Sequence, residues 1–354
     1  MKRLKKTTKI DFATYFGVIA AYIVISILMN GGMLTRSLMG QLVPICCFIV
    51  MAVSLNLTVG ILGELSLGHA GFVSVGAFTG IIASQGLLNV IESEPLRLAV
   101  ALVIGALFAA VAGFLVGIPV LRLRGDYLAI VTLAFGEIIK DLINCLIVGV
   151  DSKGLHILFN ASGKLTYNDL NLKEDGITII KGAQGATGTS TIATFTAGFV
   201  LIMITLIVVL NLTRSRAGRA IMALRDNRIA AESVGINVTK YKLMAFVTSA
   251  ALAGSAGALY GLNYSSVSSS AFNFNMSIEI LLMVVFGGLG NIWGSVIAAA
   301  VIKLLPEMLR GFDDYRMLIY AIILVLVMIA TNNPTLKNMF GKFLPKKKGD
   351  EIDG

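Results

Sequence analysis

The residues that commonly carry catalysis or bind metals are few in this sequence and far apart. There are two histidines, His69 and His156, and three cysteines, Cys46, Cys47 and Cys145, with the cysteines inside apolar tracts. Their spacing fits neither a zinc site nor a catalytic triad. A phosphate-binding loop of the form GxxxxGKS or GxxxxGKT is also absent from the sequence. We therefore expect that this chain is not an enzyme, holds no metal or cofactor, and does not itself hydrolyse ATP.

Polar residues in apolar surroundings form a second class of candidates. The segment GELSLGHAGF, residues 63–72, places Glu64, Ser66 and His69 among glycines between two apolar tracts. Polar side chains at membrane depth are costly and usually face a pathway or a partner. Two interpretations stay open: these side chains line a pathway, or Ser66 and His69 only hydrogen-bond a break between helices.

A third group lies in the segment RLRGDYLAIVTLAFGEIIKDLI. Glu137, Lys140 and Asp141 are three and four residues apart, so they share one face of a helix. Pairing of Glu137 with Lys140 would neutralise most of the cost of burying either charge. We interpret the pair as structural and keep Glu137 as a candidate for lining a pathway.

Glycines interrupt the apolar tract of residues 276–303 in the sequence FGGLGNIWG. As one helix this tract would be about 42 Å long, more than the hydrocarbon core requires. A broken or re-entrant segment is tolerated there only where it is buried in protein or lines a cavity. Gly287, Gly288, Gly290 and Asn291 are therefore candidate pathway residues. The alternative is one tilted helix whose glycines serve close packing.

Composition indicates which elements position these residues. The 354 residues are 56% hydrophobic and 14% charged, with a mean hydropathy of +0.85, which is typical of a multispanning membrane protein. Helices satisfy their own backbone groups in lipid, so we predict an all-α polytopic bundle of about 8–10 transmembrane helices, with at least one broken or re-entrant segment. The predicted spans are 12–30, 38–60, 66–87, 97–120, 127–149, 191–213, 243–262, 276–303 and 316–331.

Charge predicts the orientation of these spans. The net charge of +9 comes from basic residues at the N-terminus, in one long loop and in the C-terminal tail, which fits the positive-inside rule better than nucleic-acid binding. A return of the chain at the broken tract is needed to bring both termini to the cytoplasmic side. We predict a basic cytoplasmic N-terminus at 1–11, a transmembrane domain at 12–336 with an external segment at 150–190 and a cytoplasmic loop at 214–242, and a basic cytoplasmic tail at 337–354.

The cytoplasmic loop contains seven basic residues and a short predicted helix. Asp226 or Asn227 can cap this helix, and Gly235 can end it. It is too short to span a membrane and too polar to insert. Ala230 and Ala231 would leave a thin face for another protein, while the flanking arginines could bind anionic lipid. The alternative is an ordinary positive loop.

Several blocks of the sequence resemble a known family in both content and order. LNLTVGILGELSLGHAGF, LRLRGDYLAIVTLAFGEII, DNRIAAESVGINVTKYKLMAF, SAALAGSAGALYG and SIEILLMVVFGGLGNIWGSV cover most of residues 55–330. They are similar to the signature blocks of LivM-type permeases, the membrane subunits of branched-chain amino-acid ABC importers. The resemblance implies a subunit in a bacterial or archaeal inner membrane. Its implied partners are a second permease of the LivH type, two cytoplasmic ATPases that bind ATP and magnesium, and an external binding protein.

The same resemblance assigns the short helix to ATPase coupling. Such permeases carry an EAAxxxG-type coupling helix, which Ala230, Ala231 and Gly235 match here, although Ile229 replaces the usual glutamate. The expected coupling residues are Asp226, Asn227, Ala230, Ala231, Glu232 and Gly235. By the same comparison residues 151–180 look like an insertion, which either contacts the binding protein or is neutral.

The function that the resemblance implies is ATP-driven import of branched-chain or other hydrophobic amino acids. Related permeases for urea, amides or other small solutes share these blocks. A different class, an ion-coupled secondary transporter with Glu137 as its coupling residue, is compatible with the absent phosphate loop. The predicted docking helix argues against it, because such a transporter has no ATPase to dock.

Overall fold

The computed structural model describes residues 2–88, 90–123, 125–151, 154–160, 167–170 and 176–310, together with 315, 318–319, 321–322 and 325. The chain divides into two compact units, 1–300 and 301–354. The predicted span 316–331 falls mostly outside the described residues, and the tail 337–354 falls wholly outside them. The first unit contains every candidate residue named above.

The first unit is predominantly helical, as predicted. Five helical segments are long and apolar enough to cross a membrane: Arg36–Leu62, Glu94–Val120, Phe195–Arg214, Val238–Gly261 and Ser269–Gly287. The chain is thus a multi-pass membrane protein. The helices are α1 (Lys2–Asn30), α2 (Arg36–Asn56), α3 (His69–Gly86), α4 (Glu94–Val120), α5 (Asp126–Asn144), α6 (Phe195–Arg214), α7 (Arg216–Asp226), α8 (Arg228–Ser233), α9 (Val238–Gly261), α10 (Phe274–Gly287) and α11 (Ile292–Met308).

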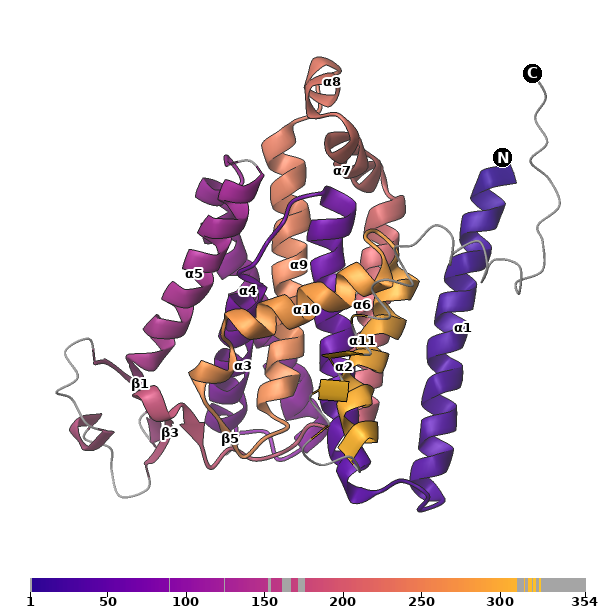
Figure 1. Cartoon of the computed structure of the whole chain (residues 1–354). Helices are drawn as coiled ribbons and strands as arrows, with labels where there is room; N and C mark the ends of the chain where they lie inside the picture. The colour runs from indigo at the N-terminus through magenta and orange to yellow at the C-terminus, as the bar shows by residue number, and fades with distance from the viewer. Residues whose placement is uncertain are drawn as a thin grey trace, which may run out of the picture. The chain divides into compact units, whose positions relative to one another are not determined.

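Helix α2 continues directly into a π-helix, η1 (Leu57–Leu62), which Gly63 ends with a left-handed φ of 80°. Short 3₁₀ turns occur at Tyr167–Leu170, Gly182–Gln184 and Ser269–Ala271. Figure 1 shows α8 at one end of the bundle and the strands at the opposite end. We call these the α8 end and the sheet end.

Glycines allow α3, α4 and α9 to pack closely at the centre of the first unit. A side-chain carbon at Gly76 would collide with the backbone of Gly254, and one at Gly257 would collide with the backbone of Val73. Gly105 of α4 lies against the same strip of α9, beside Ala258. Because small residues let helix backbones approach, this strip fixes the spacing of all three helices.

A small antiparallel sheet forms part of the sheet end. Its strands are β1 (Leu146–Asp151), β2 (Gly154–Phe159), β3 (Ile177–Lys181), β4 (Ala186–Thr187) and β5 (Ser266–Val267), in the order β2-β1-β3-β4-β5. Val148 pairs with Ile157 on one side and with Ile180 on the other.

The sheet corrects the predicted span 127–149. Helix α5 ends at Asn144, and the apolar residues after it form strand β1. A short apolar run rich in β-branched residues does not distinguish a buried strand from a helix by pattern alone. The described part of the predicted insertion, residues 151–180, forms strands β2 and β3 of this sheet together with the end of β1 and a 3₁₀ turn.

The predicted break between α10 and α11 is present. Helix α10 ends at Gly287, α11 begins at Ile292, and both Gly288 and Gly290 have positive φ angles. The two helices cross so closely that a side-chain carbon at Gly287 would collide with Gly294 and Ser295. In Figure 1, α10 runs obliquely across the upright helices α2 and α9. A single tilted helix over 276–303 is therefore wrong.

We expect Gly254→Ala to destabilise the bundle, because the added methyl group would collide with Ala109 and with the backbone of Gly105. Overpacking of this kind costs about 1–3 kcal/mol. Thermal denaturation of the detergent-solubilised protein measures the loss. Gly40→Ala, in helix α2, is the matched control, since no neighbouring atom lies within 4 Å of the added carbon. Equal melting temperatures for the two variants would contradict the close packing.

Candidate functional site

Helices α7 and α8 form a projecting tip at the α8 end (Figure 1). Ser215 caps α7 by accepting a hydrogen bond from the backbone N–H of Gly218 (3.1 Å). Asn227 caps α8 by accepting one from the N–H of Ala230 (3.0 Å). Gly235 follows α8 with a φ of 84°, a conformation that favours glycine. Of the two predicted caps, Asn227 is the one used, and Asp226 is the last residue of α7.

The two alanines of the tip differ in exposure, contrary to the expectation of a shared exposed face. Ala230 is exposed, whereas Ala231 is buried in a small cluster with Leu224 and Val238. Adjacent residues are about 100° apart around a helix, so one can pack inward while its neighbour faces out. Ala231 therefore braces the tip against α7 and α9 and does not form its surface.

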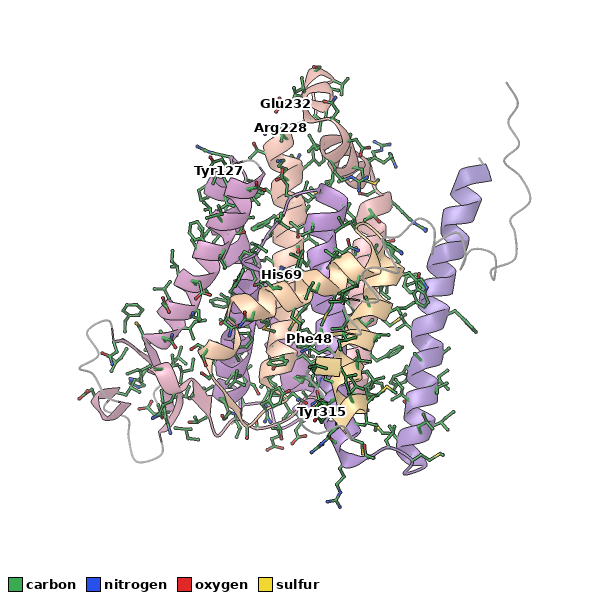
Figure 2. The ribbon with its side chains drawn as sticks, viewed as in Figure 1. Phe48, His69, Tyr127, Arg228, Glu232 and Tyr315 are labelled. Carbon is green, nitrogen blue, oxygen red and sulfur yellow. The ribbon has the colours of Figure 1, made fainter. Side chains whose placement is uncertain are left out.

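The exposed surface of the tip contains two large apolar side chains that the sequence analysis did not select. Ile229 is 77% exposed and Val234 is 76% exposed. On the same helix, Arg228 forms an ion pair with Glu232 (3.1 Å), and Figure 2 shows both residues at the tip. The sequence signal for them was that both apolar residues lie within or directly after the short helix that the sequence predicted.

Two basic side chains connect the tip region to the segment that follows α2. Nη1 of Arg225, at the end of α7, donates to the backbone carbonyl of Gly60 (2.7 Å). Lys242, in α9, forms a buried ion pair with Glu64. Glu64 is therefore a structural partner of Lys242, in addition to being a predicted pathway residue.

A buried asparagine connects the same segment to the glycine break. The backbone N–H of Gly290 donates to Oδ1 of Asn56 (2.8 Å), and Nδ2 of Asn56 donates to Oγ of Ser295 (2.9 Å). Gly288 and Asn291 flank this contact within the break. Asn56 was not selected from the sequence, because nothing in its apolar surroundings predicted a partner 234 residues away.

His69 and Ser66 lie inside the protein. His69 is buried among the helices, as Figure 2 shows, and its Nε2 is 2.9 Å from the hydroxyl of Ser54. Ser66 is also buried, in the loop between η1 and α3. The backbone N–H of Leu67 donates to Oγ1 of Thr132 (3.1 Å), whereas the Ser66 hydroxyl has no hydrogen-bond partner among the described residues, so Thr132 and not Ser66 supports this connection.

Glu137 lies in a shallow groove that borders the η1–α3 connection at Leu67 and Gly68. The groove is lined by the start of α3, by Leu133, Gly136 and Glu137 of α5, and by the start of α10. Glu137 pairs with Lys140, as predicted from their spacing. The N-terminal ends of α3 and α10 both meet this groove, and helix N-termini favour negative groups.

The candidate pathway residues thus occupy three places. Glu137 lies in the groove, Glu64, Ser66 and His69 lie in or beside the η1–α3 connection, and the glycines with Asn291 form the break. Within the described residues, no group of three or more His, Cys, Asp and Glu side chains could hold a metal ion.

Loss of Lys242 should destabilise the protein, because it leaves the Glu64 carboxylate with no counter-charge in a largely buried place. Removing one partner of a buried ion pair costs about 3–5 kcal/mol. We expect a large fall in melting temperature for Lys242→Met and recovery of most of it in the double variant with Glu64→Gln. Lys240→Met, at an exposed position of the same helix, is the control. A Lys242→Met variant as stable as this control would contradict the pairing.

Comparisons with known proteins place the chain in a family. Residues 37–328 match the family described as "Branched-chain amino acid transport system / permease component". The chain is 38% identical to the high-affinity branched-chain amino acid transport system permease protein LivM of Escherichia coli (strain K12), over 80% of this chain and 66% of that protein. The matched part is therefore slightly less than two thirds of that relative.

Two archaeal proteins of Methanocaldococcus jannaschii are also similar. The probable branched-chain amino acid transport permease protein LivM is 25% identical over 76% of this chain and 81% of its own length. The probable LivH is 27% identical over 80% of this chain and 85% of its own length. No solved structure matches the chain significantly. With its family blocks in order and most of its length matched, the chain belongs to the family of branched-chain amino acid transport system permease components.

Proposed function

We propose that this chain is the membrane-spanning permease subunit of an ATP-driven importer, in which it forms part of the pathway for branched-chain amino acids. A second permease of the LivH type completes the pathway, two cytoplasmic ATPases bind ATP and magnesium, and an external binding protein delivers the substrate. The observation that carries the proposal is the tip formed by α7 and α8.

The tip has the properties of a docking element. Large exposed apolar side chains on a projecting surface offer contact area to a protein partner. Here Ile229 and Val234 are exposed on a helix that is capped at its start and ended by Gly235. Burial of Ala231 against Leu224 and Val238 fixes the helix to its neighbours. A partner that pushes on this surface would therefore move α7 and α9 with it.

Charge supports a cytoplasmic location for the α8 end. The segment from Arg214 to Lys242 carries seven basic residues, and basic loops of membrane proteins stay on the cytoplasmic side. The sheet end then faces outward, where a binding protein would approach. Under this proposal the N-terminus and the C-terminus are both cytoplasmic, and the bilayer is a bacterial or archaeal inner membrane.

The mechanism that follows is alternating access. ATP binding draws the two ATPases together, their surfaces displace the tip, and the helices attached to it rock between inward-open and outward-open states. Such coupling requires that the ATPases and the binding protein each distinguish the two states.

Within the membrane, we assign the groove at the starts of α3 and α10 to the substrate pathway. Its one carboxylate, Glu137, would attract the ammonium group of an amino acid, and the helix N-termini opposite would favour the carboxylate. The glycine break and the η1–α3 connection, with Gly287, Gly288, Gly290, Asn291, Ser66 and His69, would adjust as the pathway opens. Urea, an amide or another small solute is the alternative substrate, and an ion-coupled transporter is the alternative class.

A charge on the tip should separate this chain from its ATPases. Burial of an unpaired charge in an apolar interface is strongly unfavourable, so we expect Ile229→Asp to lose co-purifying ATPase and ATP-dependent leucine uptake. The measurement is affinity purification from native membranes, followed by uptake into proteoliposomes. Thr239→Asp adds the same charge at an exposed position outside α8 and is the control. Absence of an ATPase from the purified wild-type complex would exclude the importer and favour the ion-coupled transporter.

Neutralising Glu137 should lower uptake and leave the ATPases bound. Loss of a charge-assisted hydrogen bond to the substrate ammonium group is expected to lower uptake about tenfold in Glu137→Gln. Asp141→Asn removes a carboxylate from an exposed position on the same helix and should transport normally. Equal uptake by both variants would remove the groove from the pathway. Competition by urea, acetamide or isoleucine during leucine uptake identifies the class of substrate.

A further inference from the structure

The residue of interest is Arg225, which lies at the junction between the tip and the membrane-embedded helices. It occupies the last turn of α7, two residues before Asn227 caps α8. Its side chain is 42% exposed, yet Nη1 reaches inward to the backbone carbonyl of Gly60 (2.7 Å). Arg225 is thus a part of the tip that touches the interior directly.

The carbonyl that Arg225 meets belongs to the end of a helix. Gly60 lies in the last turn of η1, where carbonyl groups lack partners within the helix. The C-terminal end of a helix carries partial negative charge, so a guanidinium group is a favourable partner there. A π-helix of this kind is rare and frequently occurs at functional sites. The contact is therefore charge-assisted and directional.

One turn before Gly60, the same helical segment also contacts the glycine break. Asn56 is four residues before Gly60, a spacing that places neighbours on one face of a helix. Its side chain binds the N–H of Gly290 (2.8 Å) and the hydroxyl of Ser295 (2.9 Å). Both links, to the tip and to the break, therefore start from one helical turn.

Two glycines make room for these links. A side-chain carbon at Gly60 would collide with Asn56 Oδ1 and with the backbone N of Gly290. One at Gly63 would collide with Cγ of Arg225. The turn from Asn56 to Gly63 is thus packed against both the break and the arginine, which leaves little freedom for one to move without the other.

We propose that Arg225 is a positioning residue that ties the glycine break between α10 and α11 to the tip, through Gly60 and Asn56. Displacement of α8 pulls Arg225, Arg225 shifts the end of η1, and Asn56 carries this shift to Gly290. The break is then the internal element that changes when the ATPases act. This inference rests on the proposed function, because it needs a partner that moves α8.

The test follows the conformation of the break in the assembled complex. Leu289 is 58% exposed in the break and is not one of the linking residues, so Leu289→Cys provides a reporter. Cys145, which is partly exposed, is replaced by Ser, while Cys46 and Cys47 are buried. The rate of maleimide labelling is measured with and without magnesium and a non-hydrolysable ATP analogue. We expect the nucleotide to change this rate.

Arg225→Ala should uncouple the reporter from the nucleotide. Loss of one charge-assisted hydrogen bond predicts a nucleotide effect about tenfold smaller, with ATPase still bound and with ATP hydrolysis retained. Arg219→Ala is the matched control, because Arg219 lies on the same helix and its Nη1 donates to the nearby carbonyl of Arg214 (3.2 Å). It should keep the full effect. If Arg225→Ala does not fold, Arg225→Gln removes the charge with a side chain closer in size.

Three results would decide against the inference. An unchanged nucleotide effect in Arg225→Ala would overturn it, since the link would then carry no motion. A reporter that ignores nucleotide in the unmutated background, with ATPases bound, would also overturn it, while the proposed function would survive. A complex without bound ATPase would instead overturn the proposed function. A purely structural role for Arg225 predicts lower thermal stability with the nucleotide effect intact.

Discussion

In a membrane, every interruption of a helix exposes backbone groups that lipid cannot satisfy, and this constraint shapes the first unit of the protein. The η1–α3 connection and the break between α10 and α11 both have side chains from elsewhere in the sequence as partners. Arg225 satisfies the carbonyl of Gly60, Asn56 satisfies the N–H of Gly290, and Ser277 accepts from the N–H of Ala70 (3.1 Å). The irregular segments are therefore also the places where distant parts of the chain are joined.

The same constraint explains why glycine and small polar residues occupy the interior. Without a hydrophobic force between helices in lipid, association depends on close packing and on hydrogen bonds. Gly76 and Gly254 provide the first for α3 and α9, and Thr58 and Ser249 provide the second with a bond of 2.9 Å. The centre of the bundle is therefore closely packed, and its irregular segments lie at the breaks and at the attached tip.

Function follows from the contrast between these parts. In the proposed function, the tip with Ile229 and Val234 exposed receives the ATPase, and the groove with one carboxylate binds the amino acid. Glu137 forms an ion pair with Lys140 on the same helix turn. The net charge of this part of the groove is therefore close to zero. Between tip and groove lie η1 and the glycine break, whose links give the two sites a physical connection.

The sequence by itself determined the helical membrane class, the positions of most spans, the capped tip helix, the Glu137–Lys140 pair and the interruption at Gly287 to Asn291. These are local properties, set by hydrophobic length, by caps and glycines, and by spacing along one helix. Only the tertiary structure decided that Ala231 faces inward, that residues after Asn144 form a sheet, and that Glu64 pairs with Lys242. It alone revealed Asn56 and Arg225, because their partners are separated from them by 234 and 165 residues and sequence spacing carries no information about such contacts.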